Sequence, residues 1–262
     1  MKRRRLNIIN NMKKLAVFDF DHTVIDNNSD TVVRDLIPPE KIPSTLKLLY
    51  RKDGWTSYMQ GVFELLFEHG LGKNEITAAI ESIEPVKGMC ELINSLKQEL
   101  NYDIIIISDS NTYFIDTWLK KFNLLSSIEK VFTNPAKFVN GLLKIEMYHL
   151  QCECHLSTKN LCKGKILEDY IDARGKENIH YDKVVYIGDG ANDLCPILRL
   201  NKNDLACVRA KYKCAELVKL LEMKKPIDST GNIYNIKSQV FVWENGCDIL
   251  SYIKKPFLNK GM

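Results

Sequence analysis

Short apolar runs alternate with longer amphipathic segments along most of the chain. Five such runs predict buried strands, at residues 14–19, 102–108, 130–133, 183–188 and 205–210. Helical periodicity is found between them at residues 112–122 and 165–171. Strands that alternate with helices favour right-handed crossovers, so the pattern predicts an α/β fold with a Rossmann-like, doubly wound parallel sheet.

Residues 30–95 follow a different pattern. Helix-like segments at 45–50, 55–68 and 75–82 are separated by proline and glycine, and no strong strand signal lies among them. We therefore expect a small helical cap at residues 30–95, inserted after the first strand of a catalytic core formed by residues 13–29 and 96–262. Four aromatic residues at near-helical spacing are expected in the core of the cap, although Trp55 or Tyr58 could line its entrance: Trp55, Tyr58, Phe63 and Phe67.

Composition narrows the class of protein. The chain has 262 residues, of which 45% are hydrophobic and 27% are charged. This composition is typical of globular proteins. A net charge of +4 is too small to favour a nucleic-acid partner, and no apolar run is long enough to cross a membrane. Residues 1–12 contain Arg3–Arg5 and predict a flexible basic tail, whose role as an import or phosphate-binding segment stays open. The eight cysteines lack the density of a disulfide scaffold, and a reducing, cytoplasmic location is expected.

Polar residues follow three of the predicted strands. The first strand ends in Asp19-Phe-Asp21-His-Thr23, the second in Ser108, and the fourth in a turn that contains Asp189. In a parallel sheet such strand ends share one edge, where ligands bind. Asp19 and Asp21 are two residues apart, so an extended backbone would turn both toward the same side. Three carboxylates form an all-oxygen site that suits Mg²⁺ and a phosphate, to which Ser108 could donate a hydrogen bond.

Each motif alone also fits a turn or a helix cap, but their joint order along the chain makes coincidence improbable. Asp19-x-Asp-x-Thr23, Ser108, a lysine near 163 and Gly188–Asp193 resemble the four motifs of the haloacid dehalogenase superfamily. Residues 17–30, 107–111, 131–135, 160–163 and 185–196 resemble, more narrowly, the family that contains phosphoethanolamine/phosphocholine phosphatase and pyridoxal phosphate phosphatase. This similarity spans about residues 14–255, and Ser110 with residues 132–136 is closer to the pyridoxal phosphate phosphatase branch.

The resemblance implies a Mg²⁺-dependent phosphatase. Asp19 would be the nucleophile that forms an aspartyl-phosphate, and Asp21 would act as general acid and then as general base. The metal would be held by the side chains of Asp19 and Asp189 and by the backbone carbonyl of Asp21. Lys163 or Lys165 would balance charge, and the pattern Lys-Gly-x-Ile-Leu favours Lys163.

The resemblance also assigns supporting residues. Thr23, Asn192 and Asp193 are expected close to the metal. Asp30 and Asp109 are expected to bind the substrate, a small phosphate ester with a cationic group. Asp30 could instead cap a helix, and Asp109 could brace a turn.

Pyridoxal 5′-phosphate is the first expected substrate, with phosphoethanolamine or phosphocholine as the alternative. A phosphotransferase or mutase of the same superfamily, or a non-enzymatic phosphate or nucleic-acid binder, are more distant alternatives. The sequence does not indicate an oligomeric state.

One loop is unusually rich in metal-ligating side chains. His149, Cys152, Cys154, His155 and Cys162 lie within fourteen residues. This density is compatible with zinc. The Cys-x-Cys step differs from the usual Cys-x₂-Cys knuckle, so an irregular loop without metal is the alternative.

Overall fold

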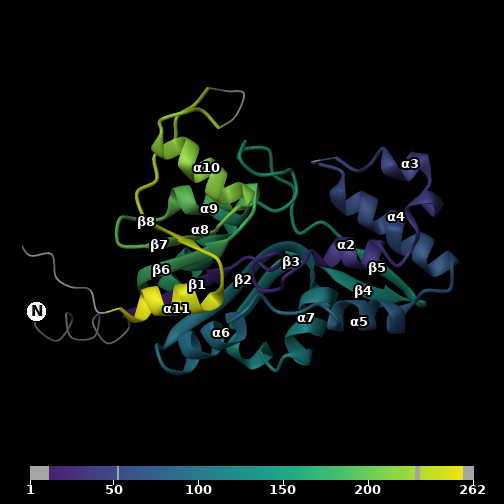
Figure 1. Cartoon of the computed structure of the whole chain (residues 1–262), viewed down its shortest axis with the longest axis horizontal. Coiled ribbons are helices and arrows are strands. Elements are labelled where there is room, and N and C mark those ends of the chain that lie inside the picture. The colour runs from purple at the N-terminus through teal and green to yellow at the C-terminus, as the bar shows by residue number, and fades with distance from the viewer. Residues whose placement is uncertain (1–11, 52, 228–230, 256–262) are drawn as a thin grey trace, which may run out of the picture.

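A six-stranded parallel sheet organises the computed structural model, which describes residues 12–51, 53–227 and 231–255 (Figure 1). Its strands are β1 (Met12–Phe18), β2 (Tyr102–Asn111), β3 (Lys130–Asn134), β6 (His180–Gly188), β7 (Leu205–Arg209) and β8 (Gln239–Trp243). They are ordered β3-β2-β1-β6-β7-β8, and every pairing between them is parallel. The basic tail predicted at residues 1–12 lies, apart from Met12, outside the described residues.

The sheet is buried on both faces, as its apolar strands predict. The four isoleucines of β2 at 104–107 are fully buried. Ile104 and Ile106 belong to one hydrophobic cluster, and Ile105 and Ile107 belong to a second cluster on the other face. Alternation along a strand produces this division, and helices must cover both faces. The carboxyl edge of the sheet is therefore the place where polar side chains can gather.

Helices form a layer on each side of the sheet (Figure 1). One layer contains α6 (Met89–Gln98), α7 (Thr112–Lys121) and α11 (Gly246–Lys254). The other contains α8 (Lys163–Lys176), α9 (Leu194–Arg199) and α10 (Lys213–Glu222). This arrangement confirms the predicted doubly wound α/β fold. None of the helices within the described ranges is long and apolar enough to span a membrane.

A group of helices follows β1 and lies beside the sheet, at the right of Figure 1. They are α2 (Ser29–Arg34), α3 (Ser44–Lys47), α4 (Trp55–Glu68) and α5 (Lys73–Glu81), with a 3₁₀ turn at Pro39–Lys41. Tyr58 and Phe63 of α4 are buried, whereas Phe67 is 46% exposed. The prediction that Phe67 belongs to the core is wrong, because its ring lies near the end of α4 against the surface turn at Gly141.

Two features of the fold are absent from the sequence prediction. The first is a hairpin of β4 (Ala136–Val139) and β5 (Leu142–Ile145), whose turn at Asn140-Gly141 has φ values of 49° and 84°. An Asn-Gly pair between apolar residues is a hairpin signal, so the expectation of irregular structure throughout 140–162 is wrong. The second feature is β8, which pairs with β7 at the edge of the sheet.

Candidate active site

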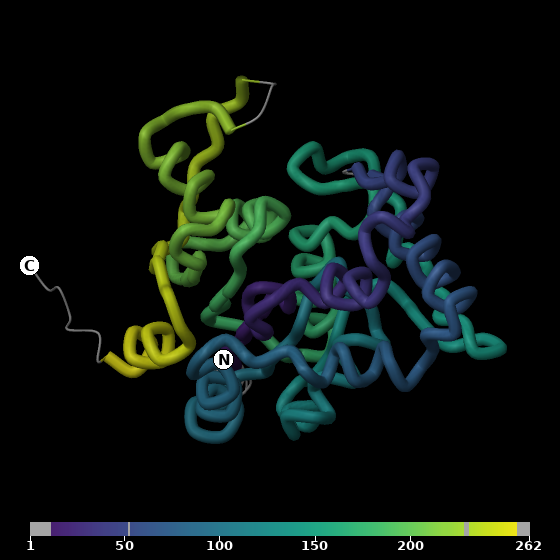
Figure 2. Tube along the Cα trace, turned by 45° about the vertical axis from the view of Figure 1, so that its right-hand side comes forward, coloured from purple at the N-terminus to yellow at the C-terminus, as the bar shows by residue number. Residues whose placement is uncertain are grey.

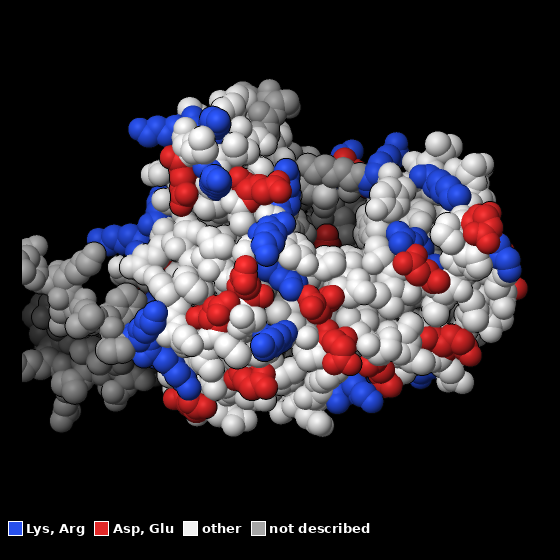
Figure 3. Space-filling view, viewed as in Figure 1, with Lys and Arg blue, Asp and Glu red and all other residues white. Residues whose placement is uncertain are grey.

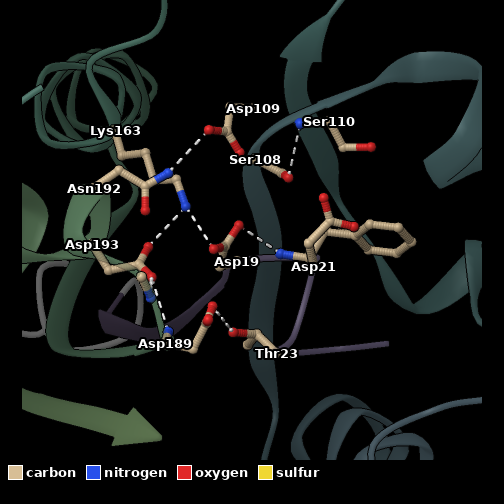
Figure 4. Close-up of polar contacts among 12 residues, drawn as sticks. Asp19, Asp21, Thr23, Ser108, Asp109, Ser110, Lys163, Asp189, Asn192 and Asp193 are labelled. Atoms are coloured by element: carbon tan, nitrogen blue, oxygen red, sulfur yellow. Dashed lines mark hydrogen bonds and ion pairs between the residues drawn. The ribbon is translucent and has the colours of Figure 1, made fainter. Parts of the chain in front are cut away.

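The predicted site residues come from the carboxyl ends of three neighbouring strands. Because β1 lies between β2 and β6, Asp19, Ser108 and Asp189 meet at one edge of the sheet (Figure 4). All three residues are buried. The molecular surface is hollowed between the part that carries α8–α10 and the part that carries α3 and α4 (Figure 3).

Lys163 lies at the centre of the site. Its side chain is fully buried, and its Nζ lies 2.8 Å from Asp19 Oδ2 and 2.8 Å from Asp193 Oδ1. Burial opposes its charge, but Asp19 and Asp193 outweigh burial and raise the pKa of Lys163 above its usual value. Lys165, the alternative, is exposed and pairs with Asp169. The fold thus brings Lys163, and not Lys165, to Asp19.

Both carboxylate oxygens of Asp193 accept hydrogen bonds. Its Oδ1 accepts hydrogen bonds from Lys163 and, at 2.7 Å, from the Tyr186 hydroxyl. Its Oδ2 accepts from the backbone N–H groups of Asp189 (2.9 Å) and Gly190 (2.8 Å). Asp193 therefore holds the lysine and the loop in place. Tyr186 was missed in the sequence, where it reads only as an apolar strand position.

The carboxylates form a group that fits a divalent cation. One oxygen from each of Asp19, Asp189 and Asp193 lies within 4.8 Å of the others. Burial first, and then the charge of Asp193, raise the pKa of Asp189 to about 7 and that of Asp19 well above its usual value. A bound cation would relieve this cost, and hard oxygen donors suit Mg²⁺. Thr23 Oγ1 donates to Asp189 Oδ1 at 3.2 Å and orients that carboxylate.

The segment after β1 is a turn. The strand ends at Phe18, residues 21–24 form turns, and His22 has a φ of 53°. We predicted that an extended backbone turns Asp19 and Asp21 toward the same side, and this premise is wrong at Asp21, which lies in the turn. Both are nevertheless buried, because the turn folds the chain back into the site: His22 N–H donates to the Asn27 carbonyl at 2.9 Å.

Asp21 is held by the start of α2. Its Oδ1 accepts from the Ser29 N–H at 2.8 Å, and its Oδ2 accepts from Asn28 Nδ2 at 3.2 Å. Burial first, and then the charge of Asp30, raise the pKa of Asp21 to about 8. This raised pKa favours the protonated form of the Asp21 carboxyl group near neutral pH, which is the form that a proton donor needs. Asn28 and Ser29 lie in a stretch that the family resemblance covers, but their contacts depend on the turn.

Ser108 and Asp109 connect the end of β2 to its neighbours. The buried Ser108 Oγ accepts from the Ser110 N–H at 3.2 Å, which leaves its own O–H able to donate. Asp109 Oδ2 accepts from Asn192 Nδ2 at 3.2 Å, so the loop after β6 and the end of β2 are joined across the site (Figure 4).

A cavity of about 330 Å³ adjoins these residues, lined in part by Asp21, Asp30, Arg51, Trp55 and Asp109. Asp30 Oδ2 accepts from Trp55 Nε1 at 2.6 Å, whereas the buried Oδ1 has no partner within the described ranges 12–51, 53–227 and 231–255. Burial raises the pKa of Asp30 to about 7. Asp30 is not a helix cap, because Asn28 occupies that position in α2 and accepts from the Thr31 N–H.

Comparison with known proteins identifies relatives that cover nearly the whole chain. Residues 14–256 match the family described as "Putative Phosphatase". Pyridoxal phosphate phosphatase PHOSPHO2 from Homo sapiens is 39% identical over 245 residues, which is 93% of this chain and 98% of that protein. Phosphoethanolamine/phosphocholine phosphatase from Homo sapiens is 31% identical over 243 residues, 92% of this chain and 88% of that protein.

Solved structures share the fold. Apo phosphoserine phosphatase is similar at a TM-score of 0.52 and 21% identity, covering 79% of this chain and 98% of that chain. A HAD family hydrolase from Salmonella enterica serovar Typhi gives a TM-score of 0.57 at 14% identity, covering 98% of this chain and 80% of that chain. The chain therefore belongs to the "Putative Phosphatase" family and is a phosphoric monoester hydrolase, with a fold like that of the solved HAD family hydrolase.

Proposed function

We propose that this phosphatase hydrolyses small phosphate esters that carry a cationic group, through an aspartyl-phosphate on Asp19 and with Mg²⁺ as cofactor. Pyridoxal 5′-phosphate is the first proposed substrate. The observation that supports the proposal is Asp30 Oδ1, a buried carboxylate oxygen beside the phosphoryl site that has no partner among the residues that the structure describes. A buried, half-satisfied carboxylate is costly unless a ligand supplies the missing charge or hydrogen bond.

In the first step, a carboxylate oxygen of Asp19 bonds to phosphorus while the bond from phosphorus to the ester oxygen breaks. Asp21 gives its proton to the departing oxygen, and its raised pKa keeps that proton available near pH 7. In the second step, a water oxygen bonds to phosphorus, Asp21 takes a proton from that water, and the bond from phosphorus to Asp19 breaks. Phosphate leaves and both aspartates return to their starting states.

The surrounding residues hold charge in position. Lys163 already contacts Asp19 and can balance the added phosphoryl oxygens. Ser108 can donate its hydroxyl to one of these oxygens. Mg²⁺, held by the Asp19 and Asp189 carboxylates and the Asp21 backbone carbonyl, would neutralise phosphoryl charge. Thr23, Asn192 and Asp193 would orient the groups around it without bonding to it.

The leaving-group cavity supports recognition of a cation. Asp30 and Asp109 line it together with Trp55 and Tyr50, whose rings pack edge to face with their centroids 5.2 Å apart. Carboxylates and aromatic faces both attract an ammonium or pyridinium group. Arg51 lines the same cavity and adds a positive charge. Pyridoxal 5′-phosphate carries a pyridine nitrogen and a phenolate, which would match Asp30 and Arg51, whereas phosphocholine offers only the cation.

Within the predicted cap at residues 30–95, α6 begins at Met89 and packs on the sheet as part of the core. We further propose that the helices α2 to α5, which precede α6, act as a cap over the core and close the cavity against water during the reaction. Figure 2 shows these helices beside the segment that precedes α8. Two hydrogen bonds join the segments: the Lys159 N–H donates to Asp53 Oδ1 at 3.1 Å, and Asn160 Nδ2 donates to Thr56 Oγ1 at 3.1 Å. A reducing compartment such as the cytosol remains our prediction, and it would keep the cysteines as thiols.

A phosphate-release screen tests this proposal. Pyridoxal 5′-phosphate, phosphocholine, phosphoethanolamine and p-nitrophenyl phosphate are compared with Mg²⁺, with EDTA, and after Mg²⁺ is restored. We expect the highest kcat/KM on pyridoxal 5′-phosphate and a reversible loss with EDTA. The Arg51→Gln variant should weaken hydrolysis of pyridoxal 5′-phosphate while sparing phosphocholine. Equal kcat/KM on all four esters would reject the cation as the recognised group.

Two other functions give different results. A phosphotransferase would form a new ester when an alcohol is added, in preference to free phosphate. A nucleic-acid binder would associate with DNA or RNA in a steeply salt-dependent way without hydrolysis. Lysine, arginine and acidic side chains are interspersed on the face drawn in Figure 3, which does not favour a polyanionic partner there.

A further inference from the structure

Three thiols from separate segments converge next to the catalytic lysine. Cys154 lies in the loop before α8, Cys162 caps the start of α8, and Cys195 lies in α9. Cys195 Sγ is 3.3 Å from Cys154 Sγ and 3.6 Å from Cys162 Sγ, and all three sulfurs lie within 4.8 Å of one another. Nothing in the proposed phosphatase chemistry uses these groups.

The sulfur spacing matches a shared metal ion. Sulfurs at about 2.3 Å from a tetrahedral Zn²⁺ stand roughly 3.8 Å apart, close to the spacing seen here. A disulfide would join only two of the three and leave the third thiol beside it without a function. A borderline-soft ion such as Zn²⁺ prefers thiolates over the oxygen donors of the aspartate group.

The surroundings suit the charge of such a site. Three thiolates and one Zn²⁺ together carry one negative charge. Arg199 Nη2 lies 4.0 Å from Cys162 Sγ, and Arg199 and Lys165 both line the adjoining cavity of about 330 Å³. His155 lines this cavity as well, so the side chain of His155 or a water molecule can complete four ligands there.

We propose that Cys154, Cys162 and Cys195 bind one Zn²⁺. On binding, each thiol releases its proton to solvent and the sulfur donates an electron pair to the metal, so no oxidant is needed. His149 is not a ligand, because its Nε2 accepts from the Cys162 N–H at 3.1 Å and so orients that residue. Cys152 is exposed and stands outside the cluster.

The metal would fasten a substrate loop to the catalytic core. Cys162 directly precedes Lys163, and Cys195 follows Asp193 by two residues, so both partners of the buried ion pair adjoin a ligand. On the loop side, Thr158 lines the leaving-group cavity. Zn²⁺ thus acts as a positioning element that fixes the loop relative to α8 and α9, and it takes no part in phosphoryl transfer.

The test measures metal content and ligand type. Protein from zinc-supplemented cells, dialysed to remove loose metal, should contain about one zinc per chain. Replacing zinc by Co²⁺ should give thiolate-to-cobalt charge-transfer bands and the intense visible bands of a tetrahedral site. We expect Cys154→Ser and Cys195→Ser to lose both signals. Cys152→Ser, the control from the same loop, and Asp189→Asn, the control for the aspartate group, should keep them.

Several outcomes would overturn the proposal. If Cys154→Ser and Cys195→Ser both still bind zinc, or if Asp189→Asn loses it, the metal is bound at a different site. If the Co²⁺-substituted wild-type protein shows no thiolate-to-cobalt bands, the three cysteines do not bind the metal. If the protein before reduction is lighter by two hydrogen atoms than the reduced protein, the cysteines form a disulfide instead. If the variants fail to fold, wild-type protein decides the question: p-mercuribenzoate should release one zinc per chain in proportion to the thiols that react, and release of none contradicts the site.

Discussion

The two ends of the active-site cleft differ in how completely their charges are satisfied. At the phosphoryl end, Asp193 has four hydrogen-bond donors and Lys163 has two carboxylates. At the leaving-group end, Asp30 keeps one buried oxygen for which no described residue is a partner. A network in which every group is hydrogen-bonded is rigid, and it should bind the phosphoryl group of every ester in the same way. A group that lacks a hydrogen-bond partner instead adds most binding free energy for the ligand that supplies one. We therefore expect the first end to control reaction rate and the second to control substrate choice.

The largest effect should follow from Asp19→Asn. Loss of the proposed nucleophile should lower kcat by roughly 10³-fold or more on every ester, cationic or neutral. The fold should persist, because the amide keeps the shape of the side chain and removes repulsion from Asp193 and Asp189. Phosphate release measures the loss of kcat, and circular dichroism checks that the fold persists. Undiminished turnover would exclude Asp19 as the nucleophile.

Lys163→Met should destabilise the phosphoryl end. The substitution leaves Asp19 and Asp193 buried without their cation, and breaking a buried pair in this way costs about 3–5 kcal/mol. Urea denaturation should show that loss in the free energy of unfolding. The matched control is Lys165→Met, two residues away and exposed, which should change stability by no more than about 0.5 kcal/mol. If both substitutions lower the free energy of unfolding by the same amount, the ion pairs of Lys163 do not stabilise the fold more than an exposed lysine does.

At the leaving-group end, Asp30→Asn should change selectivity. The kcat/KM for phosphocholine should fall about tenfold, which corresponds to about 1.4 kcal/mol, while 3,3-dimethylbutyl phosphate, its uncharged isostere, should be little affected. Asp109→Ala should act in the same direction. Asp172→Asn, on the exposed side of α8, serves as the control carboxylate. Losses of equal size on both esters would assign Asp30 a structural role only.

The smallest effect should be a pH dependence of that selectivity. Burial raises the pKa of Asp30 from 3.8 to about 7, so its carboxyl group is neutral below that pH and charged above it. The ratio of kcat/KM for phosphocholine over its uncharged isostere should therefore rise severalfold as pH passes upward through about 7. Both esters carry the same phosphate group, so the effect of its titration on kcat/KM cancels in the ratio. In Asp30→Asn the ratio should be flat; a rise of the same size there would point to another group.

Much of the phosphoryl end could be predicted because it is encoded locally. Each apolar strand is followed at once by its polar motif, and a parallel sheet with this chain order must bring those ends together. The resemblance favoured Lys163 over Lys165, but the positions of the two lysines at the start of one helix do not by themselves separate them. The choice depends on which side of α8 faces the sheet.

Other features depend on contacts between distant segments. The turn at 21–24 is set by the bond from His22 to Asn27 and by the contact of Asp21 with α2, neither of which strand periodicity contains. Trp55, 25 residues after Asp30, contacts only Oδ2 of that carboxylate, which leaves Oδ1 without a partner in the described part of the chain. In the cysteine cluster, Cys195 joins from a helix 33 residues beyond Cys162, while the nearby Cys152 stays outside.

By itself, the order of apolar runs and the residues that end them determined the sheet, the edge that carries the site, and the phosphatase family. These properties follow from burial and chain direction, which act over a few residues at a time. The tertiary structure alone decided which lysine is buried, which carboxylate has an oxygen that no described residue contacts by a hydrogen bond, and which three thiols meet. Those outcomes depend on desolvation and on hydrogen-bond partners from remote segments, and only the packed chain brings such partners together.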